Sequence, residues 1–367
     1  MNFSRTFRTR CLRQRAFGRV PAQMIVLLLA ALAAGIGVAR AQDEVPIQTE
    51  MLALRRLMPD VGPGLHGVGR GPDGRYYVLT APGAAVLVYD ASGKRVGQVP
   101  ANPVGAAAIV YGESLAVDAE GRVAVADRGA GGVKIYAPDG SLAAFVRVDS
   151  PESVAFFDSS EGSELAVASV SSKRLVSVYD VTGKLVRDFG DPSDVTEDDQ
   201  QPPQPPVPAQ QAGMGLVGSD AASNVYFIFD YLPNVTVLKY DHLGYAVFNI
   251  SAEIPELGPP PPASGQAARE EAERDAIARV KAGGALAPHR VVTGMGVDPQ
   301  NQELWVSVGT LLLHFDKDGK RLASYRTYTP SGGRLEATTI LIEADRLLLG
   351  ADPFGLYEFE RPDKVAH

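Results

Sequence analysis

The sequence predicts an all-β fold, namely a six-bladed β-propeller with four-stranded blades whose last blade is closed by an N-terminal strand. Three observations predict it: an aromatic–Asp–Gly motif that recurs after apolar runs, period-two alternation within those runs, and two irregular stretches that account for every break in the spacing. The 367 residues are 45% hydrophobic, with 38 Gly, 27 Pro and one Cys. This composition excludes a collagen-like, a wholly disordered or a disulfide-held chain.

The recurring motif places Asp and Gly just after an aromatic residue. Successive aromatic residues are 47, 43, 61, 75 and 44 positions apart, and three of these intervals match the length of a four-stranded propeller blade. The copies are Tyr89-Asp90…Gly93, Tyr136…Asp139-Gly140, Tyr179-Asp180…Gly183, Tyr240-Asp241…Gly244, Phe315-Asp316…Gly319 and a truncated Phe359-Glu360.

The two long intervals contain insertions, at 191–212 and at 251–289. Removing about 16 and about 30 residues restores a period of roughly 45 and gives six repeats. The first insertion is Pro-rich, and its 202–208 segment is expected to be extended. The second combines a run of four prolines with a predicted helix over 264–281, which either leans on the propeller or forms a solvated spacer.

The second repeat shows the blade pattern most clearly. Ser114 to Asp118, Arg122 to Asp127, Val133 to Tyr136 and Ser141 to Val148 are predicted as four strands, separated by Gly- and Asp-containing turns. The sixth repeat ends at its third strand, so we expect the run from Met51 to Leu57 to supply the missing outer strand. Closure of this kind removes exposed sheet edges.

Propeller topology assigns the loops to faces. Connections from an outer strand to the next inner strand open on the same face as the loops between second and third strands. Both insertions, and the shorter 100–112 segment, are connections of the first kind, so we expect them on one face. Long loops in a compact domain are usually functional, whereas the tight Asp–Gly turns of the opposite face are typical of a structural side.

Residues 1–41 have the pattern of a secretory signal peptide, with a basic start, an apolar run from Met24 to Val38 and Ala39-Arg40-Ala41. That run is shorter than the roughly 20 residues of a spanning helix, although an uncleaved anchor remains the alternative. No Arg-Arg pair precedes it, so a Sec-type export route to the periplasm or the medium is expected. The predicted domains are then the leader, a propeller at 42–363 and a tail at 364–367.

Removal of the leader changes the charge. Residues 1–41 carry seven Arg and no Lys or acid, so the formal charge would change from −8 to −15. A strongly acidic surface disfavours nucleic acid and anionic lipid as partners, and no membrane contact is expected beyond the export signal. The single Cys11 lies in the leader, so thiol catalysis is excluded from the mature chain.

The stretch GESLAVDAEGRVAVADRGAGGVKIYAPDGSLAAF in the second repeat resembles an NHL-type repeat, and weaker versions occur in the first and fifth repeats. The resemblance covers about 51–361 and implies a propeller, but NHL-type propellers include enzymes, sensors and binding modules. Amidating lyases of this type hold a metal with three His. Here only His66 and His289 fall near inner-strand starts, so that activity is not expected.

Gluconolactonase-like propellers hold a divalent cation with Glu, Asn and Asp at the channel mouth, and this chain offers carboxylates there. Such Asp residues also begin turns, where the side chain bonds backbone amides, and we weigh that structural role more heavily. The paired Asn residues of the lactonase pattern are not evident. The candidate ligand-binding residues at the channel mouth are His66, Glu113, Glu152, Asp127, Asp230 and Asp352.

Two functional hypotheses follow. The leading one is an exported, monomeric, non-catalytic module that binds a protein, a peptide or a small molecule at the insertion-bearing face and needs no cofactor. The competing one is a metal-dependent hydrolase or lyase, lactonase-like, with Glu113, Glu152 and Asp127 among the ligands of a divalent cation in the central channel.

Overall fold

The computed structural model describes residues 48–192, 213–231, 234–254, 256 and 290–362. The predicted leader, most of both insertions, the helix predicted at 264–281 and the tail at 364–367 lie outside the described residues. Two single 3-10 turns lie within the described residues, at Gly105–Ala107 and Arg128–Ala130. None of the described helices is long and apolar enough to cross a membrane.

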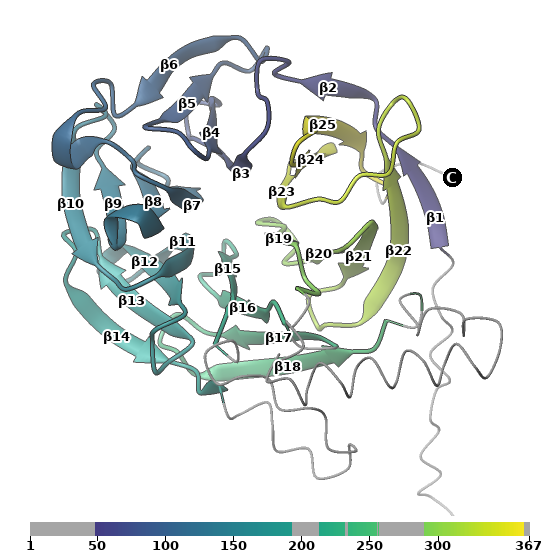
Figure 1. The fold of residues 1–367 in the computed structure, drawn as a ribbon. Coiled ribbons are helices and arrows are strands. Elements are labelled where there is room, and N and C mark those ends of the chain that lie inside the picture. The colour runs from purple at the N-terminus through teal and green to yellow at the C-terminus, as the bar shows by residue number, and fades with distance from the viewer. Residues whose placement is uncertain (1–47, 193–212, 232–233, 255, 257–289, 363–367) are drawn as a thin grey trace, which may run out of the picture. The chain divides into compact units, whose positions relative to one another are not determined.

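The described strands form six sheets arranged around a central axis, as the predicted six-bladed propeller requires (Figure 1). Apart from the two N-terminal strands described below, the strands of each sheet follow chain order from the axis outward and are antiparallel. The second blade has the four strands expected, each within two residues of its predicted ends. The strands of blades one to three are β3 (Leu65–Arg70), β4 (Tyr76–Thr80), β5 (Val86–Tyr89), β6 (Arg95–Val99), β7 (Gly112–Val117), β8 (Val123–Asp127), β9 (Gly132–Tyr136), β10 (Leu142–Arg147), β11 (Pro151–Ser159), β12 (Gly162–Ser169), β13 (Val176–Asp180) and β14 (Leu185–Phe189).

The second half of the ring repeats this plan. Its strands are β15 (Gly215–Ser219), β16 (Val225–Phe229), β17 (Val235–Tyr240), β18 (Ala246–Ala252), β19 (Gly294–Val297), β20 (Leu304–Val308), β21 (Leu311–Phe315), β22 (Arg321–Tyr328), β23 (Thr339–Ile342), β24 (Arg346–Ala351) and β25 (Gly355–Glu360). The two insertions connect β14 to β15 and β18 to β19, which are outer-to-inner connections as predicted.

The ring closes through the N-terminal segment, but this segment serves two blades rather than one. β2 (Arg55–Leu57) pairs antiparallel with β25 and completes blade six, as expected. β1 (Gln48–Leu52) instead pairs parallel with β22 and gives blade five a fifth strand. The chain crosses between the blades at Ala53 and Leu54, whose amides donate to carbonyls of β22 and β25, respectively. The single closing strand predicted from Met51 to Leu57 is therefore divided.

The described core consists of six buried clusters, and each lies between two neighbouring blades. The recurring aromatic residues contribute to these interfaces: Phe359 packs in a cluster with Trp305 of blade five, and Tyr89 packs in one with Leu348 of blade six. Burying an apolar side chain of this size contributes about 1.5–3 kcal/mol. The aromatic repeat is thus a packing feature that joins blade to blade.

The Asp–Gly part of the motif makes the tight turn before the outer strand in blades one to five. The Asp90 carboxylate accepts the amides of Ser92 and Lys94, two and four residues later, and Gly93 has a φ of 83°. Glycine populates this left-handed region without a steric penalty. Asp180, Asp241 and Asp316 make the same pair of backbone contacts. The expected structural role of these turns is therefore visible in their hydrogen bonds.

Candidate functional site

The inner strands enclose a channel along the propeller axis, with a cavity volume of about 1080 Å³. Because each inner strand runs from the insertion-bearing face to the opposite face, the channel has two distinct ends. The insertion-side mouth is formed by His66, Glu113, Arg128, Glu152, Asp230, Arg290 and Asp352. The far end is formed by Arg70, Asp118, Asp298 and Glu343. The waist between them is mainly apolar, with Val68, Leu115, Val154, Val217, Ile340 and Leu341.

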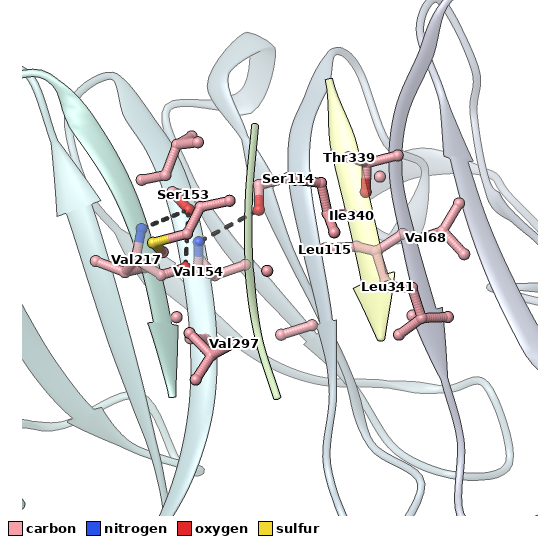
Figure 2. Close-up of a pocket in the computed structure, with 18 of the residues that line it drawn as sticks. Val68, Ser114, Leu115, Ser153, Val154, Val217, Val297, Thr339, Ile340 and Leu341 are labelled. Carbon is pink, nitrogen blue, oxygen red and sulfur yellow. Dashed lines mark hydrogen bonds between the residues drawn. The ribbon is translucent and has the colours of Figure 1, made fainter. Parts of the chain in front are cut away.

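Serine side chains bridge neighbouring inner strands at the waist. Ser153 Oγ on β11 accepts the Val217 amide of β15 at 3.0 Å, and Ser114 Oγ on β7 accepts the Val154 amide at 3.4 Å (Figure 2). The inner edge of each blade has no further strand beside it, so its amides need such partners. These bonds join blades two, three and four and hold the channel wall in place.

His66 at the start of β3 is held in one tautomer. Its Nδ1 lies 2.8 Å from the carbonyl oxygen of Gly112, which can only accept, so Nδ1 carries a hydrogen. In the neutral ring, Nε2 is then the nitrogen with a free lone pair. The ring also makes an edge-on contact with Tyr111 at 5.6 Å between centroids. His66 is thus an oriented base at the insertion-side mouth.

Glu113 and Glu152 occupy equivalent positions in neighbouring blades, in the sequences Glu113-Ser114-Leu115-Ala116 and Glu152-Ser153-Val154-Ala155. Their surroundings differ. Glu113 Oε1 lies 3.2 Å from Nη1 of Arg128, which follows β8. The residue that corresponds to Arg128 after β12 is Val170, because Asp127 and Ser169 hold the same register position opposite the start of the inner strand. Blade three therefore lacks the arginine that blade two provides.

Glu152 consequently has no hydrogen bond or ion pair with any residue of the described chain. It is partly buried, and this burial raises its pKa to about 7, with the negative charge of Asp230 adding to the effect and Arg290 and Arg128 opposing it. A carboxyl group with a pKa near neutrality exchanges its proton under physiological conditions. Such groups in a cleft are candidates for function.

Asp230 follows β16 and is 3% exposed. Its Oδ2 accepts from Nη2 of Arg290 at 2.8 Å, whereas Oδ1 is buried with no hydrogen-bond partner among the described residues. Burial raises the pKa of Asp230 to about 6, against the lowering effect of Arg290. Buried acceptors are normally satisfied, so the free oxygen is unusual.

Asp352 follows β24 and is exposed at the mouth, where Oδ1 accepts the Gly64 amide at 2.6 Å. Asp127 has the same position in its blade, but the structure places it outside the channel lining. It is fully buried and accepts from Lys134 Nζ at 2.8 Å and from the amides of Val110 and Tyr111. Burial alone would raise its pKa, but these donors hold the pKa of Asp127 below its usual value. The expectation that Asp127 faces the mouth is corrected by this geometry.

Five of the six predicted residues therefore line one cavity: His66, Glu113, Glu152, Asp230 and Asp352. The two arginines of the mouth, Arg128 and Arg290, are not among the residues predicted from the sequence. Arg128 stands directly after Asp127 in a second-to-third loop, a position that topology assigns to this face, so a signal for it was present. Arg290 is the first described residue after the second insertion, and only the fold shows that it reaches Asp230.

The carboxylates and His66 do not assemble a metal centre. Among the described residues, no group of three or more His, Cys, Asp or Glu side chains is arranged to hold a metal ion. The ligand set suggested by the enzyme hypothesis, Glu113, Glu152 and Asp127, is thus not brought together. Glu113 is paired with Arg128, and Asp127 is enclosed by Lys134 and backbone amides.

Comparisons with solved structures find other propellers at low similarity. Virginiamycin B lyase from Staphylococcus aureus is 14% identical, with a TM-score of 0.47 over 84% of this chain and 87% of that one. A streptogramin B lyase is 11% identical, with a TM-score of 0.48 over 82% and 84%. A catalytically inactive S. aureus virginiamycin B lyase with quinupristin is 11% identical, with a TM-score of 0.49 over 83% and 97%. Identities this low say nothing about activity. No family model matches the chain, and no curated protein matches its sequence.

Proposed function

We propose that the protein is a binding module that takes up a small organic molecule in its central channel, entering at the insertion-side mouth. The cavity carries this proposal: about 1080 Å³ with charged groups at one end and an apolar waist beneath them. Ligand sites of this size commonly combine apolar walls with a few polar groups that orient the ligand. The leading hypothesis from the sequence named a protein, a peptide or a small molecule, and the enclosed channel favours the last.

A channel-blocking variant tests this function. Ala116 and Thr339 line the cavity and are partly exposed to it, so Ala116→Phe and Thr339→Phe should narrow the passage. We expect compounds that raise the melting temperature of the unmodified protein to lose that effect in both folded variants, because a ligand stabilises only the state it binds. Equal stabilisation of the blocked and unblocked proteins would overturn the proposal.

A second candidate function is hydrolysis or elimination by acid–base chemistry at the same mouth. Two observations favour it, namely the oriented Nε2 base of His66 and the carboxyl of Glu152 with a pKa of about 7. In lactone hydrolysis, for example, a base takes a proton from water, the hydroxide adds to the carbonyl carbon, the ring C–O bond breaks and the proton passes to the released oxygen. None of these steps requires the divalent cation of the earlier enzyme hypothesis.

A panel of lactones and esters, assayed with EDTA and then with added Ca²⁺, Mg²⁺ or Zn²⁺, tests that candidate. Turnover in EDTA that falls at least a hundredfold in both His66→Gln and Glu152→Gln would support it. Turnover that survives in both variants, or no turnover of any compound, would exclude these two residues as its acid and base.

We also propose that the protein acts outside the cytoplasm, because residues 1–41 have the pattern of a secretory leader. We propose separately that it acts as a monomer. Amino-terminal sequencing of the exported protein should show a chain that begins near Gln42. Size-exclusion chromatography with light scattering should give the mass of one chain. A full-length chain retained at the membrane would indicate the anchor alternative.

A further inference from the structure

We propose that the ligand of the channel is an organic ammonium ion, a protonated amine attached to an apolar group, with Glu152 as its counter-charge. The inference rests on the proposed binding function and names the class of ligand. It follows from the balance of charge at the insertion-side mouth, from the buried acceptor of Asp230 and from the apolar waist below.

The charged side chains at the insertion-side mouth favour a cation over an anion. Both arginines at the mouth are already paired, Arg128 with Glu113 and Arg290 with Asp230. Glu152 is paired with none of the described residues, and Asp352 meets only the Gly64 amide. Among the residues that the structure describes, the mouth therefore has acids without counter-ions and no arginine without one. An anionic ligand would find no unpaired cation there, whereas a cation would find a free carboxylate.

Two acids of the mouth are buried without the partners that a buried carboxylate needs. Asp230 is 3% exposed and lines the cavity, yet its Oδ1 has no hydrogen-bond partner among the described residues. An unsatisfied buried acceptor is costly, and so is a desolvated carboxylate such as Glu152. The Glu152 side chain makes no contact with the described residues that supports the fold in return, and Asp230 is held by Arg290 through Oδ2 alone. An ammonium group, with up to three N–H donors, supplies the hydrogen bonds and the positive charge that both lack.

The body of the ligand would meet the side chains below the mouth. There the wall includes the apolar side chains of Leu115, Val154 and Leu341, with Ser114 and Ser153 beside them (Figure 2). A metal ion or a small hydrated cation gains nothing from those apolar side chains, and the described residues form no metal-holding group. An alkyl or cyclic group attached to the ammonium would be removed from water there. The mouth and the waist together fit a cationic head with an apolar tail.

The comparison of blades two and three provides a sharp test. Arg128 pairs with Glu113 in blade two, and Val170 holds the corresponding position beside Glu152 in blade three. Val170→Arg should place a permanent cation beside Glu152, in the position proposed for the ammonium group of the ligand. Glu152→Gln removes the charge with little change in shape. Glu336→Gln is the matched control, because Glu336 is an exposed acid on the β22–β23 connection of the same face that does not line the cavity.

The probes are hexylammonium, hexanol and hexanoate, which share one apolar chain and differ in charge, and calorimetric titration of the purified protein at pH 8 measures their dissociation constants. We expect hexylammonium to bind at least tenfold more tightly than hexanol, and hexanoate to bind most weakly. Glu152→Gln and Val170→Arg should each weaken hexylammonium binding about tenfold and leave hexanol within twofold. Glu336→Gln should change none of the three.

Two outcomes would overturn the inference: no preference for hexylammonium over hexanol, including no binding of either, or a preference that persists in both Glu152→Gln and Val170→Arg. Failure of the underlying function looks different. If all three probes bind equally and Ala116→Phe abolishes their binding, the channel is a ligand site but the ammonium class is wrong. If binding of hexylammonium is unaffected by Ala116→Phe and Thr339→Phe, the channel is not the site.

Discussion

The two ends of the channel contain the same kinds of side chains and differ in how these are paired. At the far end, Glu343 accepts from Arg70, from Arg346 and from the Tyr76 hydroxyl at 2.5–2.8 Å. At the insertion-side mouth, Glu152 has no such partner among the described residues. Asp298 at the far end bonds Arg361 and the Gln300 amide, while Asp230 at the mouth leaves Oδ1 without a bond.

This difference separates structural charges from charges available to a ligand. The far-end groups connect strands from blades one, five and six, where the ring closes, so their ion pairs contribute to closure. The mouth groups leave acceptors unused at a cost to folding. Unpaired groups retained at such a cost are expected where a protein needs them for binding.

The largest loss of stability is expected from a substitution at the far end of the channel. Arg361 is 1% exposed, and its Nη1 lies 2.7 Å from Asp298 Oδ2 and 3.1 Å from the Glu343 carbonyl oxygen. Arg361→Met should lower the free energy of unfolding by about 3–5 kcal/mol, because it leaves Asp298 as a buried charge without its arginine. Urea unfolding measures this loss. Lys317→Met, which removes an exposed ion pair, is the control and should give no measurable change.

A loss below about 1 kcal/mol in Arg361→Met would contradict the assignment of the far end to ring closure. Hexylammonium affinity is a second measurement on the same variant. It should remain within twofold of the unmodified protein, since the proposed ligand contacts the opposite mouth.

A substitution of Asp127 should cause the next largest loss of stability. Asp127→Asn weakens the buried bond to Lys134, whose side chain is 4% exposed, and should lower the free energy of unfolding by about 2–4 kcal/mol. Binding of hexylammonium should stay within twofold, since Asp127 does not line the cavity. An Asp127→Asn protein of normal stability that fails to bind the probe would instead place Asp127 in the site.

Asp127 also shows what the sequence could predict and where it could not. Asp127, Asp230 and Asp352 all begin second-to-third loops, and topology alone places them alike. Asp127 differs from the other two because the neighbouring strand provides Lys134, which pairs with Val125 in the β8–β9 ladder. The corresponding positions in the other two blades are Val237, opposite Ile228, and Leu356, opposite Gly350. A lysine inside the apolar strand from Gly132 to Tyr136 requires a buried partner, so this signal was available in the sequence.

The repeat period predicted six blades, the closing strand and the connections that carry the insertions, since each depends on local patterns and counting. The fifth strand of blade five could not be predicted this way. Whether Gln48 to Leu52 pairs with β22 or with β25 depends on where the chain crosses between blades, at Ala53 and Leu54. The lack of an ion pair at Glu152 could not be predicted from the sequence either. It arises because Val170 stands where blade two has Arg128, and this correspondence is seen only when the strand registers of blades two and three are aligned.

The pH dependence of the free energy of unfolding tests whether the Glu152 carboxylate is buried without a partner, as its contacts indicate. Its pKa is raised by burial from 4.5 to about 7 in the folded protein. Between these values the unfolded chain has released this proton and the native state still holds it, so the contribution of Glu152 to stability falls as the pH rises from 4.5 to 7 and is constant above. The raised pKa of Asp230 acts in the same direction, so a variant is needed to separate the two.

We therefore expect Glu152→Gln to gain stability relative to the unmodified protein, by about 2 kcal/mol between pH 5 and pH 8. This value allows for the partial exposure of the side chain. Urea unfolding of both proteins at four pH values gives the difference directly, with Glu336→Gln as the exposed control. A difference that does not change with pH would mean that Glu152 is solvated in the folded protein, and the contrast between the two channel ends would lose its main support.

The smallest expected effect is the change of hexylammonium affinity with pH, which should follow the ionisation of Glu152. Hexylammonium remains protonated throughout the range from pH 6 to pH 8, whereas Glu152 gains its negative charge there. The affinity for hexylammonium should therefore rise by up to about tenfold over this range, while the affinity for hexanol should stay constant. Asp230 adds negative charge over the same range. The other ionisable groups around Glu152 at the mouth are Arg290, Arg128, Glu113 and His66.

Glu152→Gln and Val170→Arg assign the titrating group. In Glu152→Gln most of the pH dependence should disappear, since the group proposed to respond is gone. In Val170→Arg the new arginine should hold Glu152 in its charged form at lower pH, so the affinity should be weak and nearly independent of pH. If Glu152→Gln keeps the full increase from pH 6 to pH 8, the response comes from another group of the mouth such as Asp230, and the counter-charge of the ligand would have to be reassigned to that group.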